Sequence, residues 1–83
     1  MQVQVKLFAT LRQAAGWSEQ MLELPAEATV DTLFTQLENA HPGLNLRRRS
    51  IYAAINEEFA QLDSPLHVGD RVAIFPPVSG GKQ

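Results

Sequence analysis

The end of the sequence places the strongest constraint on the fold, because an apolar run there meets two prolines. Residues 71–75 read Arg-Val-Ala-Ile-Phe, a pattern that is typical of a buried strand. Pro76 and Pro77 each lack a backbone N–H and fix φ, so the chain must leave the sheet in a stiff, extended form. The residues that follow, Val-Ser-Gly-Gly-Lys-Gln, cannot pack a core. We therefore expect the tail that begins here to be the working part of the molecule.

Length and composition predict one small globular domain, over residues 1–75, followed by the extended tail over residues 76–83. A chain of 83 residues is the length of a single domain. Such a chain buries only about 60% of its unfolded surface, so its core must be small. With 45% apolar and 19% charged residues, the composition is that of a globular protein rather than a disordered one.

The charge pattern and the absence of long apolar segments exclude several classes of partner. A net charge of −2 argues against non-specific binding of nucleic acid, which needs a basic face. We interpret Arg47-Arg48-Arg49, a short run without interleaved aromatic residues, as a solvated loop. No run approaches the roughly 18 apolar residues of a membrane span, and the first residues do not resemble a secretory signal. With no cysteine either, we expect a cytoplasmic protein that binds neither nucleic acid nor membrane.

The side chains predict no active site of their own. Without cysteine there is no thiol nucleophile, thiolate metal site or redox pair. His41 and His67 are far apart in the sequence and have no set of carboxylates nearby, so they make a poor metal or catalytic pair. Glu57 and Glu58 are adjacent on a predicted turn and therefore point apart. We expect neither a bound metal nor a bound cofactor.

The first half of the chain predicts two strands and one long helix. Residues 2–7 alternate polar and apolar, which puts Val3, Val5 and Leu7 in the core and Phe8 on the outer face. A short helical turn over residues 10–16 and a second strand over residues 19–24 follow, and their spacing favours an antiparallel pair. A helix capped by Thr29 and ended before Pro42 carries one apolar stripe of Val30, Leu33, Phe34, Leu37 and Ala40.

The second half predicts strands that return to the same sheet. Residues 51–55 form the third strand, residues 56–58 a turn, and residues 59–66 an irregular segment with room for a short strand near Phe59. A turn over residues 68–70, with a glycine available for positive φ, precedes the last strand. This order predicts an α+β fold of the ubiquitin-like β-grasp type, a mixed sheet with one main helix packed across it.

In that fold the last strand lies beside the first and parallel to it. Phe75 then faces away from the buried Ile74, on the same side as Phe8, so the two rings share one exposed patch. An aromatic side chain on the outer face is either covered by local structure or part of a docking surface, and the residues alone do not favour docking over local cover.

The tail itself suggests chemistry at a carboxylate. A carboxylate at the end of a Gly-Gly tail is a group that an adenylating partner activates and a sulfur donor converts to a thiocarboxylate. Glycines suit this role because they have no side chains and adopt whatever backbone angles a narrow site demands. From Pro76 to Gly81 the tail reaches roughly 20 Å at about 3.3 Å per residue, enough to enter a partner's pocket.

Three stretches that span nearly the whole chain carry a family resemblance. Residues 69–81, Gly-Asp-Arg-Val-Ala-Ile-Phe-Pro-Pro-Val-Ser-Gly-Gly, resemble the C-terminus of the small subunits of molybdopterin synthase, the MoaD-like sulfur carriers. Residues 5–12, Val-Lys-Leu-Phe-Ala-Thr-Leu-Arg, resemble that family's first strand and turn, and residues 51–58 resemble its middle strand. The ending Phe-Pro-Pro-Val-Ser-Gly-Gly is a specific signal for this family, whereas a Gly-Gly pair alone would not be specific.

The resemblance implies a function and a set of partners. An adenylating enzyme similar to ubiquitin-activating enzymes consumes ATP to activate the carboxylate of Gly81, and a sulfur donor makes the thiocarboxylate. The large synthase subunit, in a heterotetramer of two small and two large subunits, takes up the tail and uses the sulfur to convert precursor Z (cyclic pyranopterin monophosphate) to molybdopterin. By family likeness the inserted tail is Val78, Ser79, Gly80 and Gly81, and the partner interface is Phe8, Phe75, Pro76 and Pro77.

Lys82 and Gln83 depart from the family pattern, in which the chain ends at the second glycine. Three explanations compete: the protein is a precursor that is trimmed after Gly81, the two residues do not belong to the natural protein, or the chain is an inactive or differently used relative. The Gly-Gly end also fits a thiamine-type carrier or a ubiquitin-related modifier, which retention of a thiazole synthase or of the large synthase subunit would distinguish. A ubiquitin-like interaction module without sulfur chemistry is the alternative from a different class.

Overall fold

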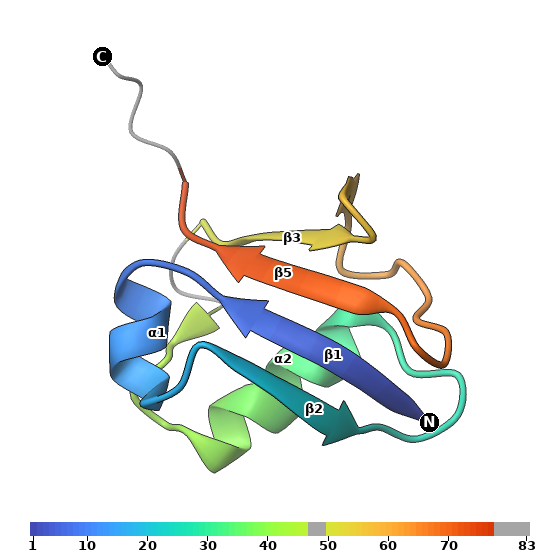
Figure 1. The fold of residues 1–83 in the computed structure, drawn as a ribbon, viewed down its shortest axis with the longest axis horizontal. Helices are drawn as coiled ribbons and strands as arrows, with labels where there is room; N and C mark the ends of the chain where they lie inside the picture. Colours follow the sequence, from blue (N-terminus) through green and yellow to red (C-terminus); the bar gives the residue numbers. More distant parts are fainter. Residues whose placement is uncertain (47–49, 78–83) are drawn as a thin grey trace.

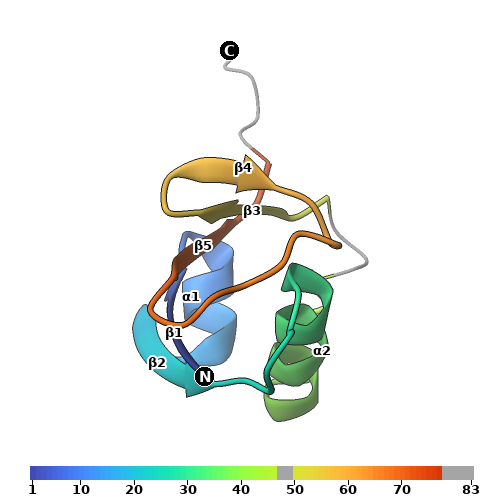
Figure 2. The ribbon, with the colours of Figure 1, turned by 90° about the vertical axis from the view of Figure 1, so that its right-hand side faces the viewer.

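The fold is a five-stranded mixed sheet with helices on one face (Figures 1 and 2). The computed structural model describes residues 1–46 and 50–77. The strands occur in the order β2-β1-β5-β3-β4; β1 is parallel to β5, and the other neighbours are antiparallel. The elements are β1 Gln2–Leu7, α1 Thr10–Ala15, β2 Glu19–Glu23, α2 Val30–Ala40, β3 Tyr52–Ile55, β4 Glu58–Ala60 and β5 Arg71–Phe75. The predicted β-grasp architecture is therefore confirmed, including the parallel pairing of the first and last strands.

The core lies between the sheet and the helices. Alternation sets which strand residues face it, since Val3, Val5 and Leu7 of β1 are buried while their neighbours are not. Four residues of the apolar stripe predicted for α2 are also buried in the core. The buried apolar residues are Val3, Val5, Leu7, Leu11, Leu24, Ala28, Val30, Leu33, Phe34, Leu37, Leu44, Leu46, Ala53, Leu66, Val72 and Ile74.

Local signals fix the ends of the helices. The hydroxyl of Thr29 accepts a hydrogen bond from the Thr32 N–H, and the Thr32 hydroxyl accepts one from the Thr29 N–H, which forms a reciprocal cap at the start of α2. Gly16 ends α1 in the left-handed region at φ 87°, where its N–H donates to the carbonyl of Arg12. Both boundaries follow from the predicted capping residues.

One prediction about the core was wrong, and two core residues were not predicted. Ala40, predicted to extend the apolar stripe, is exposed because α2 ends there. Leu44 and Leu46, which lie outside the regular elements, belong to the core and are 0% and 1% exposed. The third strand also begins one residue later than predicted, at Tyr52. Residues 47–49 of the arginine run lie outside the described part of the chain.

A two-residue turn joins β3 to β4. Asn56 and Glu57 have φ of 50° and 75°, the two positive values of a type I′ hairpin, and Ile55 lies opposite Glu58. The observed turn is therefore one residue shorter than the predicted turn over residues 56–58. The short strand expected near Phe59 is β4.

The carboxylate of Asp70 holds this turn against the start of β5. It is the buried charged side chain among the described residues, at 9% exposure. Its Oδ1 accepts from Asn56 Nδ2 at 3.0 Å, and its Oδ2 accepts from the backbone N–H of His67 at 2.8 Å. The Oδ1 of Asn56 in turn accepts from the N–H of Arg71 at 3.0 Å. One carboxylate thus connects the β3–β4 turn, the turn before β5 and β5 itself.

Replacing Asp70 with Ala should lower the free energy of unfolding by about 2–3 kcal/mol, because hydrogen bonds to a charged acceptor are strong and their donors would lose their partner. Urea unfolding measures the change. Asp63→Ala is the matched control, since Asp63 is exposed, and its effect should stay within about 0.5 kcal/mol. Equal stability of the two variants would contradict this role for Asp70.

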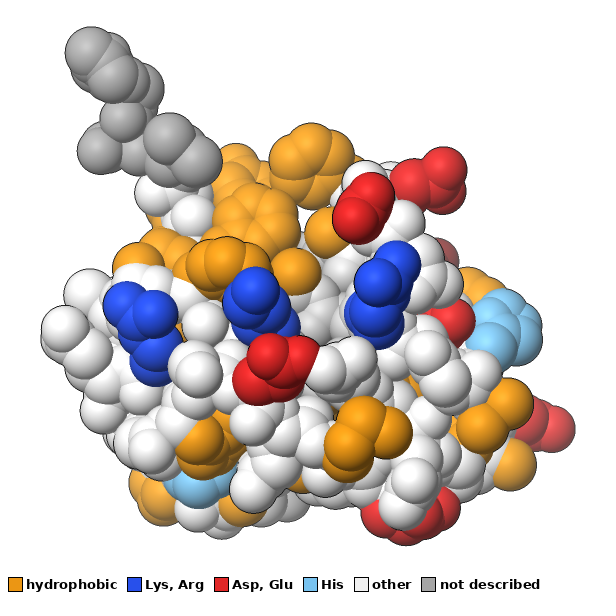
Figure 3. All heavy atoms as spheres, viewed as in Figure 1, with side chains coloured by type: hydrophobic (Ala, Val, Ile, Leu, Met, Phe, Trp, Pro, Cys, Tyr) orange, Lys and Arg blue, Asp and Glu red, His pale blue; other side chains and the backbone are white. Residues whose placement is uncertain are grey.

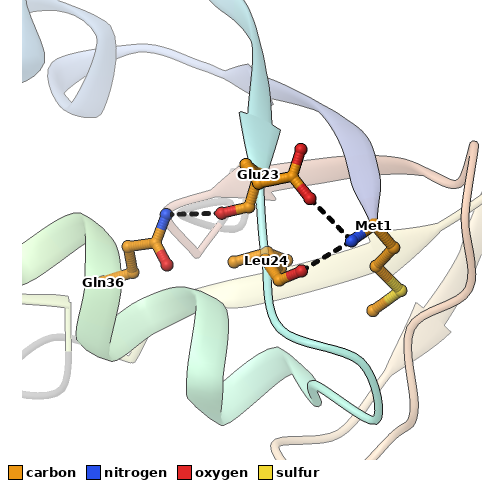
Figure 4. A network of polar contacts seen from close by, with 4 residues as sticks. All are labelled: Met1, Glu23, Leu24 and Gln36. Atoms are coloured by element: carbon orange, nitrogen blue, oxygen red, sulfur yellow. Dashed lines mark hydrogen bonds and ion pairs between the residues drawn. The ribbon is translucent and has the colours of Figure 1, made fainter.

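A second polar network fastens α2 to the edge of the sheet at β2 (Figure 4). Gln36 Nε2 donates to the carbonyl of Glu23 at 3.0 Å. The α-amino group of Met1 donates to Glu23 Oε2 at 2.8 Å and to the carbonyl of Leu24 at 2.7 Å. Gln36 therefore donates a hydrogen bond to a backbone carbonyl of the edge strand β2, on the side where no neighbouring strand lies.

The described residues contain neither a helix that could cross a membrane nor a cluster of side chains that could hold a metal ion. No helix in residues 1–46 and 50–77 is long and apolar enough to cross a membrane. Within the same residues, no three His, Asp or Glu side chains lie together in the way that a metal site would need.

Candidate functional site

Four aromatic rings gather on the face of the sheet that the helices leave open. We call Phe8, Tyr52, Phe59 and Phe75 the aromatic patch. The ring of Phe75 lies 6.4 Å from that of Phe8, 6.0 Å from that of Tyr52 and 6.0 Å from that of Phe59, centroid to centroid. Tyr52 and Phe59 are 6.2 Å apart. These separations are those of favourable aromatic pairs, and Phe75 is the member that touches all the others.

Strand register brings these rings together from three strands and a turn. Phe75 lies opposite Tyr52 in the β5–β3 ladder, and Phe59 lies opposite Ala54 in the β3–β4 ladder. Residues that are opposite in a ladder point to the same face of a sheet. Phe8 follows β1 and continues the parallel pairing, since its N–H donates to the carbonyl of Ile74 at 3.2 Å.

The aromatic patch is exposed to an extent that is unusual for large apolar side chains. Phe8 is 38% exposed, Tyr52 47% and Phe59 79%. Tyr52, Phe59, Ala60 and Phe75 line a hollow in the surface, and Figure 3 shows the apolar side chains as one continuous area. A contiguous apolar area of this kind marks an interaction site.

Two of the predicted interface residues, Phe8 and Phe75, lie in the aromatic patch, and the sequence interpretation missed its other two members. Phe8 and Phe75 are in contact, as predicted. Pro76 is half-buried and Pro77 exposed, directly after Phe75. Tyr52 and Phe59 were not predicted as part of the interface. Alternation along residues 51–55 puts Tyr52 outward, but Phe59 becomes its neighbour only through the two-residue turn.

Positive charge borders the aromatic patch. The Nζ of Lys6 lies 5.3 Å from the centroid of the Phe8 ring, within the range of a cation–π contact. Lys6, Phe8 and Arg71 line one groove of the open face, which also contains Glu19 and Glu57. Figure 3 shows Lys and Arg side chains in a row along the lower border of the apolar area.

The two histidines have structural contacts on separate parts of the molecule. His41 caps the end of α2, and its Nε2 accepts from the indole Nε1 of Trp17 at 3.2 Å. The Nδ1 of His67 lies 3.8 Å from Asp70 Oδ2 at the turn before β5. His67 and Phe59 of the aromatic patch line the same hollow, whereas His41 lies at the end of α2.

The tail begins at the aromatic patch, because β5 ends at Phe75 and the two prolines follow at once. The predicted tail residues Val78, Ser79, Gly80 and Gly81 lie outside the described part of the chain, as do Lys82 and Gln83. The geometry therefore gives the point from which the tail starts. An apolar docking area at this point would hold a partner next to whatever the tail carries.

Comparison with known proteins matches this arrangement to a family. The model of the ThiS family matches residues 5–81. A molybdopterin synthase sulfur carrier subunit from Chlamydomonas reinhardtii is 41% identical over 83 residues, which cover 98% of this chain and 100% of that protein. The protein of the same name from Homo sapiens is 35% identical, over 96% of this chain and 94% of that protein.

Solved structures share the fold. The crystal structure of SAMP1 from Haloferax volcanii superposes with a TM-score of 0.83 at 35% identity and covers 98% of this chain and 100% of that one. A complex of subunits 1 and 2 of molybdopterin-converting factor from Helicobacter pylori contains a chain with a TM-score of 0.71 at 24% identity; the match covers 98% of this chain and 100% of that one, and it shows the fold alone. The chain therefore belongs to the ThiS family, the ubiquitin-like β-grasp proteins that include the molybdopterin synthase sulfur carrier subunits.

Proposed function

We propose that this protein is the sulfur carrier subunit of a cytoplasmic molybdopterin synthase and carries sulfur as a thiocarboxylate on Gly81. The observation that carries the proposal is the aromatic patch at the start of a Gly-Gly tail, in a chain 41% identical to a carrier subunit over its whole length. A carrier needs a surface for its partners and a reactive end, and here the two are adjacent. In this proposal the chemistry takes place at the terminal carboxylate of the tail and not at a side chain.

Loading takes two steps, both on a partner enzyme. Once Lys82 and Gln83 have been removed, the carboxylate of Gly81 attacks the α-phosphate of ATP, pyrophosphate leaves, and an acyl-adenylate forms. Sulfur at the oxidation level of sulfide then attacks the acyl carbon, AMP leaves, the sulfur loses its proton, and a thiocarboxylate remains. The aromatic patch docks the folded domain on the adenylating enzyme while the tail, roughly 20 Å long from Pro76 to Gly81, reaches the nucleotide.

Unloading takes place on the large synthase subunit, where the tail delivers its sulfur to precursor Z and two such transfers complete the dithiolene of molybdopterin. Both partners need the same tail and the same aromatic patch, so they bind in turn. An assembly of two small and two large subunits places one loaded tail in each large subunit. The complex of the two converting-factor subunits from Helicobacter pylori supports a partner of this kind.

The test is genetic complementation in a cell that lacks its own sulfur carrier and needs molybdenum cofactor. The chain that ends at Gly81 should restore activity of a molybdenum enzyme, and deletion of residues 80 and 81 from that chain should abolish it. Met21→Ala, an exposed residue on the same sheet face but outside the aromatic patch, should leave it unchanged. Full activity after the deletion would instead indicate an interaction module without sulfur chemistry.

Protein modification is a second candidate function, favoured by the likeness to SAMP1, a small archaeal modifier protein of Haloferax volcanii. A modifier uses the same activated carboxylate but transfers it to an amine instead of accepting sulfur. Digestion of cell protein followed by mass spectrometry distinguishes the two, because only a modifier leaves a glycine remnant on lysine side chains of other proteins.

A further inference from the structure

The turn between β1 and α1 holds an alanine in a conformation that suits glycine. The N–H of Leu11 donates to the carbonyl of Phe8 at 3.1 Å, so residues 8–11 form a hydrogen-bonded β-turn. Ala9, its first central residue, has φ 54° and ψ −130°. These are the angles of the first central residue of a type II′ turn, a position at which glycine is the usual residue. Ala9 is therefore strained by its Cβ.

The surroundings hold Ala9 in this conformation from both sides. Leu7 before the turn and Leu11 after it are 1% and 0% exposed, so both ends of the turn are anchored in the core. The carbonyl of Ala9 accepts from the N–H of Arg12 at 3.2 Å, which starts α1 in place of a side-chain cap. Strained residues persist where neighbouring contacts determine the backbone, and they occur preferentially at functional sites.

The residue that this turn orients is Phe8. The N–H of Phe8 donates a hydrogen bond to the carbonyl of Ile74, and its carbonyl accepts one from the N–H of Leu11. The backbone of Phe8 is therefore held on both sides. Its ring meets Phe75 edge to face, with an interplanar angle of 88°, and lies beneath Lys6. At 38% exposure the ring is only partly packed, and the backbone must therefore supply much of its order.

We propose that Ala9 is a positioning residue, which holds Phe8 in the aromatic patch before a partner arrives. A strained but rigid turn fixes one backbone geometry, whereas glycine would permit this geometry and many others. Pre-ordering of an interface side chain strengthens binding because the ordering is not required at the moment of association. The part of this inference that concerns partners rests on the proposed function.

Comparing three different residues at position 9 distinguishes the effect of backbone strain from the effect of backbone rigidity. L-alanine is strained and rigid, glycine is relaxed and loose, and D-alanine is relaxed and rigid, because the mirror image of φ 54°, ψ −130° lies in the broad extended region. Ala9→D-alanine is accessible by ligating a synthetic peptide of residues 1–13 to a recombinant remainder that begins with cysteine at position 14. Desulfurisation then restores Ala14, and the chain contains no other cysteine.

Thermal unfolding and binding to the cognate large synthase subunit should rank the three proteins differently. We expect D-alanine to raise Tm by about 4–8 °C and glycine to raise it less, since glycine also gains freedom in the unfolded chain. We expect Ala9→Gly to weaken binding about 3- to 10-fold through the extra ordering of Phe8, while D-alanine binds at least as tightly as the natural protein. Ala26→Gly, at an exposed loop position, should bind normally.

A measurement without any partner completes the design. The nuclear Overhauser effect between the Phe8 and Phe75 rings should weaken in Ala9→Gly and persist with D-alanine. Unchanged binding and an unchanged ring contact in Ala9→Gly would overturn the inference. If the natural protein does not bind the large subunit at all, the proposed function fails, and the ring contact still decides whether Ala9 positions Phe8.

Discussion

A chain that ends at Gly81 is expected to accept sulfur at its terminus, whereas the chain that ends at Gln83 is not. In the longer chain the carbonyl of Gly81 belongs to an amide bond with Lys82, so it has no oxygen that can attack ATP. The free carboxylate of Gln83 lies two residues further on and is preceded by a long cationic side chain. A site narrow enough to select two glycines would exclude both side chains. Loss of loading should be complete rather than partial.

Intact mass spectrometry after incubation with the activating enzyme, ATP and a sulfur donor measures this directly. Three chains are compared, ending at Gly80, Gly81 and Gln83, and only the middle one should gain the mass of sulfur in place of oxygen. The chain that ends at Gly80 controls for the length of the tail. Incorporation of sulfur into the chain that ends at Gln83, with Lys82 and Gln83 still present, would refute the proposal. The mass of the protein from its own host would show whether trimming occurs.

The fold was largely predictable because local signals agreed with one another along the chain. Alternation identified β1 and its core residues, Thr29 and Gly16 set helix boundaries, and the prolines ended β5. The errors arose where burial depends on packing instead of local pattern. Leu44 and Leu46 lie outside any regular element, so no periodicity marks them as core residues.

The aromatic patch was predictable only in part, for a related reason. Phe8 and Phe75 follow from alternation along two strands that the fold makes neighbours. Phe59 joins them only because a two-residue turn pairs it with Ala54, and a turn one residue longer would point it to the other face. The strain at Ala9 leaves no trace in the sequence, because alanine there also fits an ordinary loop.

Replacing Phe75 with Ala should weaken binding to the large synthase subunit by on the order of 100-fold, close to 3 kcal/mol at about 1.4 kcal/mol per tenfold change. Phe75 is at the centre of the aromatic patch, in contact with all three other rings, and it directly precedes the tail. Binding energy concentrates on central aromatic residues of an interface, while peripheral ones contribute less. Titration calorimetry with the isolated large subunit provides the measurement.

The four single alanine variants of the aromatic patch test this geometry more sharply than one variant does. Phe75→Ala should weaken binding most, and Phe59→Ala should weaken it less. If binding depended only on the exposed area of each ring, the order would be reversed, because Phe59 is far more exposed than Phe75. Met21→Ala controls for apolar area elsewhere on the open face, and circular dichroism confirms that each variant is folded. If Phe59→Ala weakens binding more than Phe75→Ala, the centre of the interface lies over β4 and away from the tail. Docking would then not place Gly81 in the partner's active site, and the link between the aromatic patch and sulfur transfer would be lost.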